Sequence, residues 1–104
     1  MDTNNPIVQE IISRIKTVFD PEIPVNIWDM GMIYDITVDA EMNAKILMTV
    51  TAPNCPVAET LPVEVKTAVE AVSQLKSVWV ELTFDPPWDP DRLTDEARLE
   101  LGLM

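Results

Sequence analysis

Cys55 has the clearest capacity for chemistry, because it is the one cysteine of the chain. It lies between Asn54 and Pro56, where the sequence predicts that a helix can begin. The free amides and the dipole of a helix N-terminus stabilise a thiolate, the nucleophilic and metal-binding form of cysteine. The alternative is an unreactive cysteine that packs as a small hydrophobic residue. One thiol cannot hold a four-ligand cluster, so shared coordination across a dimer, together with a carboxylate or a small thiol, would be required.

Acidic side chains form a second group. Asp20, Glu22, Asp29 and Asp35 lie in or beside one irregular segment. Two carboxylates held close together can separate their pKa values and carry out acid–base catalysis. Surface loops are often acidic simply because they are solvated. Catalysis by these carboxylates is therefore the weaker interpretation.

The composition excludes several classes of function. The 104-residue chain has no histidine, which removes the Ser-His-Asp and Cys-His arrangements of hydrolases and the histidine zinc sites. Its two glycines, Gly31 and Gly102, are too far apart to form a phosphate-binding loop. Seven basic and 18 acidic residues give a net charge of −11, which opposes binding to nucleic acid or anionic membranes and favours basic protein partners. We therefore expect a protein that is not an enzyme.

Length and hydropathy predict a single soluble domain over residues 1–104. The chain is 47% hydrophobic, which suffices for one core. Its apolar runs are far shorter than the roughly 20 residues that cross a bilayer. No basic start followed by an apolar segment marks the chain for export, so a cytoplasmic location is expected.

The predicted elements begin with a helix from about Pro6 to Phe19, capped by Asn5, with apolar residues at helical spacing. Residues 20–31 form an irregular segment in which Gly31 supplies an unusual backbone angle. From Met32 to Val38, apolar residues alternate with others and predict a half-buried strand that places Met32, Tyr34, Ile36 and Val38 on one face.

A second strand with alternating residues 45–50 predicts an antiparallel hairpin with the first. The next helix either begins near Thr60 or starts at Pro56 and is kinked, because Pro62 is tolerated only in the first turn. Residues 78–84 alternate again and predict a third strand, whose pairing the sequence leaves open.

The predicted fold class is α+β. Its order of helix, strand, strand, helix, strand makes a two-layer domain with both helices on one face of a three-stranded sheet. Residues 85–91, rich in proline around Trp88, predict an extended tail that covers part of the sheet, with Trp88 either as an internal anchor or as a polyproline-type ligand. Thr94 can cap a short final helix that Gly102 ends.

Four segments, taken together, resemble the iron–sulfur cluster assembly domain of the SufT and PaaD type, which includes a eukaryotic cytosolic assembly component. Residues 20–27 read Asp-Pro-Glu-Ile-Pro-Val-Asn-Ile, and residues 29–34 read Asp-Met-Gly-Met-Ile-Tyr, close to the family's DPE-x-P-V-N-I and D-L-G-L-I-Y segments. Thr51 through Cys55-Pro56 resembles its T-x-x-x-C-P element, and residues 86–88 and 99–102 resemble its P-P-W and L-G-L ending.

The resemblance implies a small α+β fold and a role in the maturation of iron–sulfur proteins, with Cys55 as the candidate ligand for metal or cluster. The matching motif residues around this site are Asp20, Pro21, Glu22, Asp29, Gly31, Tyr34, Thr51 and Pro56, and the candidates for partner contact are Pro87 and Trp88. The length without a cysteine-rich tail favours the short member associated with the SUF machinery over a PaaD-like protein.

Two functions remain open from the sequence alone. In the first, the domain aids delivery of clusters to client apoproteins through Cys55 and contacts with SUF assembly proteins. It would hold a cluster or iron transiently, with no stably bound cofactor, and a homodimer is one form it could take. In the second, the domain is an acidic adaptor in which Cys55 is structural. An RNA-binding function is much weaker, because the backbone clamp of KH domains is absent and the charge has the wrong sign.

Overall fold

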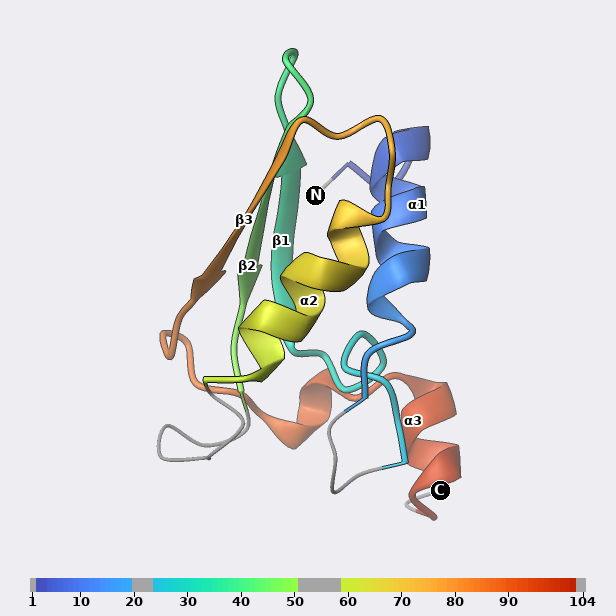
Figure 1. The fold of residues 1–104 in the computed structure, drawn as a ribbon. Coiled ribbons are helices and arrows are strands. Elements are labelled where there is room, and N and C mark those ends of the chain that lie inside the picture. Colours follow the sequence, from blue (N-terminus) through green and yellow to red (C-terminus); the bar gives the residue numbers. More distant parts are fainter. Residues whose placement is uncertain (1, 20–23, 51–58, 103–104) are drawn as a thin grey trace.

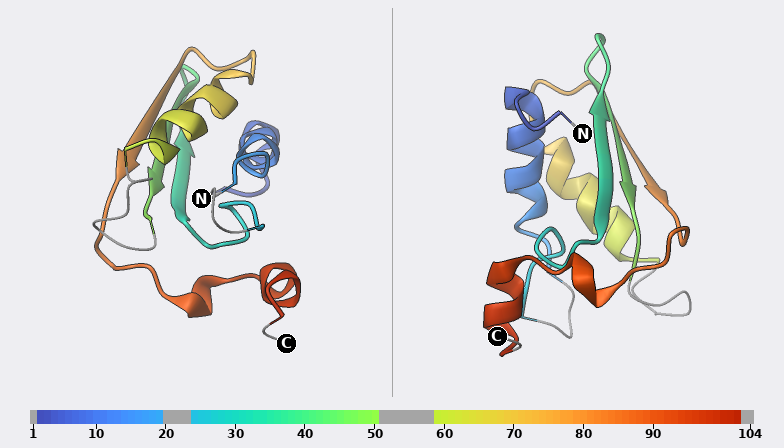
Figure 2. Two further views of the ribbon diagram at one scale, coloured as in Figure 1. Left: turned by 60° about the horizontal axis from the view of Figure 1, so that its bottom comes forward. Right: turned by 180° about the vertical axis from the view of Figure 1, so that it is seen from behind.

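Two helices cover one face of a three-stranded sheet, as the sequence predicted (Figures 1 and 2). The computed structural model describes residues 2–19, 24–50 and 59–102. In chain order the elements are α1 (Pro6–Ile15), β1 (Ile33–Val38), β2 (Asn43–Met48), α2 (Leu61–Glu70), β3 (Ser77–Leu82), a short 3-10 helix (Pro90–Arg92) and α3 (Asp95–Glu100).

Helix α1 starts where the sequence predicted but ends earlier. The Asn5 side chain accepts a hydrogen bond from the Ile7 amide at 2.9 Å, which satisfies a free donor of the first turn. The helix ends at Ile15, not at Phe19 as expected. The reason is that the Val18 carbonyl accepts from the Ile27 amide at 2.9 Å, so the chain leaves the helix to pair with the following loop.

Strands β1 and β2 form the expected antiparallel hairpin, with Ile36 opposite Ile46. The register shifts by one residue between Ile33 and Asp35, which is a β-bulge. Because of this bulge, Ile33 and Ile36 are both buried and Tyr34 does not share the core face of Ile36. The strict alternation predicted from Met32 to Val38 is therefore wrong at the beginning of the strand.

Strand β3 pairs with β2 in parallel, with Val80 beside Ile46, which gives the sheet order β1-β2-β3. A parallel pair requires a crossover connection, and α2 provides it. The sequence left the pairing of the third strand open. It is parallel to β2 because α2 carries the chain back over one face of the sheet. The observed strands β2 and β3 each begin and end slightly earlier than the alternating residues suggested.

Helix α2 begins at Leu61, with Thr60 as its N-cap and Pro62 in its first turn. This confirms the first of the two predicted starts, because proline lacks the amide that a later position would need. Residues 59 and 60 form a turn directly before this helix. The expectation that a helix N-terminus directly follows Cys55 concerns residues 55–58, which lie outside the described residues.

The core lies between the sheet and the two long helices. Its largest fully buried side chains include those of Ile11, Ile15, Ile36, Ile46, Met48 and Val65. After the sheet, Thr94 accepts a hydrogen bond from the Ala97 amide at 3.2 Å and caps α3, as predicted. Within the described ranges, the helices are all too short or too polar to span a membrane.

The hairpin loop contains one carboxylate whose pKa differs from its ordinary value. Asp39 accepts hydrogen bonds from the amides of Glu41 and Asn43, both at 2.9 Å, and from the Asn43 side chain at 3.1 Å. The hydrogen bond from the backbone amide of Asn43 is the main cause that lowers the pKa of Asp39 below its ordinary value of 3.8, because it stabilises the ionised form. The same loop holds Met42 at a left-handed φ of 66°.

We expect Asp39→Ala to lower the free energy of unfolding at neutral pH. In acid, the free energies of unfolding of the variant and of the wild type should lie closer together. The folded state lowers the pKa, so the stabilisation is present above the unfolded pKa and is lost as the pH falls through the lower folded value. Urea unfolding of both proteins at neutral pH and below about pH 4 measures the difference. A difference that stays constant across this range would contradict the role of the carboxylate.

Candidate functional site

The segments that carry the predicted site meet at one end of the sheet. The loop between α1 and β1, the end of β2, the first turn of α2 and the C-terminal tail all lie at the lower end of the molecule in Figure 1. The Thr49 amide donates to the Met32 carbonyl at 2.8 Å and joins the end of β2 to this loop. The predicted site residues in the described ranges are Asp29, Gly31, Tyr34, Pro87 and Trp88, and those outside them are Asp20, Pro21, Glu22, Thr51, Cys55 and Pro56.

Residues 26–31 form a single tight turn, closed at its start by Asn26 and Asp29. The Asn26 side chain accepts from the Asp29 amide at 2.9 Å, and its own amide group donates to the Asp29 carboxylate, also at 2.9 Å. This exchange is similar to the reciprocal pairing of a helix capping box. Asp29 therefore holds the turn together, which explains its place in the motif without any catalytic role.

Gly31 ends the same turn with a left-handed φ of 74°. The Gly31 amide donates to the Trp28 carbonyl at 3.0 Å, and the Met32 amide donates to the Ile27 carbonyl at 3.2 Å. This pair of bonds is the Schellman pattern that ends helices, and the side chains of Ile27 and Met32 are both fully buried, as the pattern favours. The prediction that Gly31 supplies an unusual backbone angle is confirmed.

The tail holds this turn by its free carbonyl groups. Three consecutive carbonyl oxygens, those of residues 29, 30 and 31, each accept one hydrogen bond from the tail. The donors are the Thr94 amide at 3.0 Å, the Trp88 indole at 2.7 Å and the Arg92 Nε at 2.8 Å, in that order. We call Trp88, Arg92 and Thr94 the tail clamp. The carbonyls at the end of a helical turn have no partner within the turn, and the tail clamp supplies one for each.

Tyr34 connects the beginning of β1 to the tail. Its hydroxyl donates to the Pro86 carbonyl at 2.7 Å, and the Arg92 guanidinium lies over its ring, 4.3 Å from the centroid. A cation over an aromatic face is attracted by the ring quadrupole, which fixes the direction of the arginine. Tyr34 thus positions the same arginine that binds the Gly31 carbonyl.

The tail lies along this end of the molecule, as Figure 2 shows, and Trp88 is partly buried against the core. This places Trp88 as an internal anchor, the first of its two predicted roles, while Pro87 is exposed. Sequence reasoning missed Arg92. A single exposed arginine among aspartates carries no signal of its own, and only the pairing of the tail with the turn reveals its contacts.

The described residues organise this end but do not form a metal site. No group of three or more acidic, histidine or cysteine side chains that could hold a metal ion occurs among residues 2–19, 24–50 and 59–102. Cys55 lies outside these ranges, in the segment between the end of β2 and the start of α2. The geometry offers a fixed turn and tail beside the two described ends of that segment, namely the end of β2 and the start of α2.

Comparison with known proteins identifies the family of the chain. Residues 8–82 match the family described as "Iron-sulfur cluster assembly protein". The chain belongs to this family. The iron–sulfur cluster assembly domain that the sequence motifs resembled is thus confirmed as its family, and the match runs from α1 to the end of β3.

Relatives of this assembly-family chain match it over nearly its whole length. It is 44% identical over 104 residues to an "Fe-S protein maturation auxiliary factor" of Porphyromonas gingivalis, covering 97% of this chain and 99% of the relative. It is 30% identical to the Staphylococcus aureus "Fe-S protein maturation auxiliary factor SufT", covering 83% and 98%. A Bacillus anthracis structure described as a domain of unknown function superposes with a TM-score of 0.88 at 31% identity, covering 94% of this chain and 93% of that one.

We expect Gly31→Ala to destabilise the protein. A Cβ at Gly31 would lie 2.5 Å from both the Arg92 Cβ and the Arg92 carbonyl oxygen, and the positive φ adds strain for any residue with a side chain. Strain of this kind costs about 1–3 kcal/mol before the clash is counted. Urea unfolding measures the loss, and Gly102→Ala is the matched control, because its φ is 73° but a Cβ there meets nothing within 4 Å. Equal losses in the two variants would show that the contact with Arg92 does not matter.

Proposed function

We propose that the protein is an auxiliary factor in the maturation of iron–sulfur proteins and aids the delivery of clusters to client apoproteins. The observation that carries this proposal is the family match over residues 8–82, together with relatives named as maturation auxiliary factors over the same length. The cluster is the cargo in this role and no resident cofactor is required.

Cys55 is proposed as the residue that contacts iron or the cluster during transfer. It is the one thiol in the chain, and thiolates are the ordinary ligands of iron–sulfur clusters. The described residues gather no other set of ligands that could take its place. A single thiol supports brief contact better than stable storage, because the remaining coordination positions must be filled by the donor or by the client.

The clamped turn supports this role by giving a fixed surface at the same end of the molecule. The three carbonyls of residues 29–31 are bound to the tail, so neither segment can move without breaking several hydrogen bonds at once. A rigid frame lowers the entropy lost when a partner binds. In this role Asp29, Gly31, Tyr34 and Trp88 belong to the frame and take no direct part in the chemistry.

Partners of the factor are proposed to be client apoproteins and proteins of the SUF machinery. With a net charge of −11, the protein attracts basic surfaces over distances of about a Debye length, roughly 8–10 Å in physiological salt. The tail contributes exposed carboxylates at the same end as the turn, among them Asp85, Asp89, Asp91 and Asp95. This acidity also supports the second candidate function, an adaptor in which Cys55 has no chemical part.

Replacement of Cys55 separates the two functions. We expect Cys55→Ala, and equally Cys55→Ser, to reduce the activity of iron–sulfur enzymes in cells to about the level of a strain that lacks the gene. The reason is that neither side chain provides a thiolate ligand. The measurement is enzyme activity per amount of client protein, with the variant's own abundance checked to exclude loss through unfolding. Full activity in both variants at normal abundance would favour the adaptor.

A further inference from the structure

The outer edge of β3 is a strand edge without a partner in the described part of the chain. The sheet order β1-β2-β3 leaves one side of β3 unpaired. The Thr83 amide donates to the Met48 carbonyl at 2.8 Å, so the backbone of Thr83 faces β2. Because successive residues of a strand direct their amide and carbonyl groups to opposite sides, those of Val78, Val80 and Leu82 face outward. We call these three residues the β3 edge.

Natural proteins protect such edges, but this one has few of the usual devices. The strand from Ser77 to Leu82 contains no proline, and it pairs with β2 without a bulge. Its one charged residue, Glu81, is directed across the sheet to Lys45 at 3.9 Å. The opposite edge strand, β1, carries the bulge already described. An edge that is regular and apolar is prone to pair with another strand.

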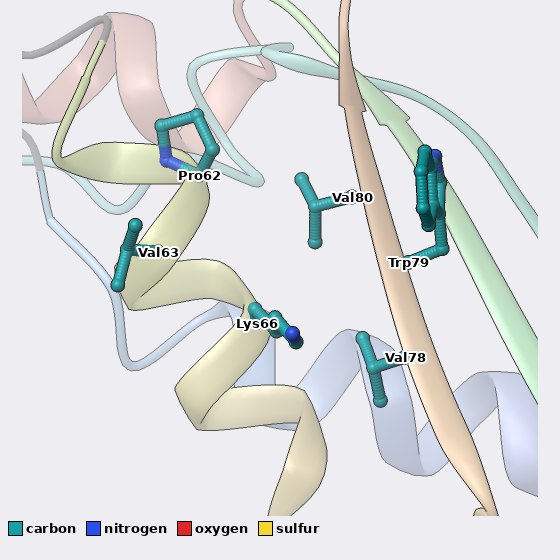
Figure 3. A pocket seen from close by; sticks show the side chains of 6 residues that line it. All are labelled: Pro62, Val63, Lys66, Val78, Trp79 and Val80. Carbon is teal, nitrogen blue, oxygen red and sulfur yellow. The ribbon is translucent and has the colours of Figure 1, made fainter.

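Apolar surface lies on both sides of the β3 edge. On the helix side, a groove of about 240 Å³ lies between α2 and β3 and is lined by Pro62, Val63, Lys66, Val78, Trp79 and Val80 (Figure 3). The Trp79 ring lies on the opposite side of the strand from Val78 and Val80, away from α2. The exposed fractions of Val63 and Trp79 are 62% and 65%, which are high for large apolar residues. Burial of these side chains would favour association.

The low charge of this part of the chain is compatible with a second copy as the partner. Residues 59–84, which include α2 and β3, carry four of the 18 acidic residues and two of the seven basic residues. The strand β3 itself carries one charged residue, Glu81, which is paired with Lys45, so two copies that meet edge to edge bring few like charges together. A strand edge also matches itself when a second copy is related by a two-fold axis.

We propose that two copies of the protein pair antiparallel through the β3 edge and form one six-stranded sheet. The register that fits best centres the two-fold axis on Trp79. Val78 and Val80 of one copy then exchange hydrogen bonds with Val80 and Val78 of the other, and the two Trp79 rings meet on the open face of the sheet. Ser77 lies opposite Glu81 of the second copy, so the two glutamates stay about 14 Å apart along the strands.

An axis centred on Val80 is less favourable. It would bring the two Glu81 residues to within about 7 Å of each other along the strands and would separate the two tryptophans. Like charges close together across strands are destabilising. Such a dimer does not require that the protein carry a cluster, and so it can be tested without any iron. It would nevertheless bring two copies of Cys55 into one assembly.

The direct test is a disulfide across the proposed axis. In a Cys55→Ser background, Trp79→Cys would place two thiols on directly opposite residues of an antiparallel pair, within the range that a disulfide bridges. We expect a covalent dimer under mild oxidation by diamide. The matched control is Thr37→Cys in the same background, because Thr37 is also exposed on the open face but lies on β1. Crosslinking of Trp79→Cys no faster than that of Thr37→Cys would overturn the proposal.

A second measurement uses the wild-type chain, which keeps Trp79, as the reference. Sedimentation of the wild-type chain at increasing concentration should show a monomer–dimer equilibrium. Trp79→Lys should weaken the dimer at least about tenfold, because it places two cations beside the axis and removes the aromatic pair. Thr37→Lys, with the same charge change on the same face, should leave the dimer unchanged. A wild-type monomer at every concentration, or a dimer that Trp79→Lys does not weaken, would refute the β3 interface.

Discussion

Three backbone carbonyls, those of Asp29, Met30 and Gly31, hold together the end of this protein that carries the candidate site. Each is left without a partner by the turn that contains it, and each accepts a hydrogen bond from the tail. A hydrogen bond of this kind contributes about 1 kcal/mol net to stability. The tail clamp therefore satisfies the turn, and the turn in return gives the proline-rich tail a fixed place on the molecule.

The residue types at this end follow from that constraint. Gly31 is required because the tail backbone at Arg92 lies where a side chain would project. Trp88 provides an indole donor together with a ring that packs on the core, and phenylalanine would provide only the ring. Tyr34 holds Pro86 with its hydroxyl and Arg92 with its ring. The motif residues that were candidates for a chemical role and that the structure describes make contacts that hold the turn and the tail together.

This division sharpens the functional proposal. The frame occupies the end of the sheet where β2 leaves and α2 begins, and the segment between these two elements contains Cys55. The frame residues make hydrogen bonds that hold the turn and the tail, while Cys55 remains the candidate for contact with iron or a cluster. The β3 edge lies along the side of the sheet and provides a separate surface for a second copy. Chemistry, partner recognition and association can thus use different parts of a small protein.

Periodicity and capping predicted the elements, because they depend on residues close together in the chain. Asn5, Thr94 and Pro62 each marked a helix start through local hydrogen bonding or its absence. The early end of α1, the bulge after Ile33 and the parallel pairing of β3 could not be predicted, because each depends on contacts between distant segments. The same holds for Arg92, whose partner Gly31 lies 61 positions earlier in the sequence. For Cys55, Asp20 and Glu22, the sequence predictions stay predictions.

Native-state amide hydrogen exchange tests the tail clamp most directly. The Thr94 amide donates to the Asp29 carbonyl, and the Met32 amide closes the turn, so the two report on the tail and on the turn separately. If the tail holds the turn, both amides open in one cooperative step, and Trp88→Phe lowers both opening free energies by the same amount, about 1 kcal/mol, or roughly fivefold in rate. If Met32 kept its full protection in Trp88→Phe while Thr94 exchanged faster, the turn would be stable without the tail, which would contradict the clamp as its support.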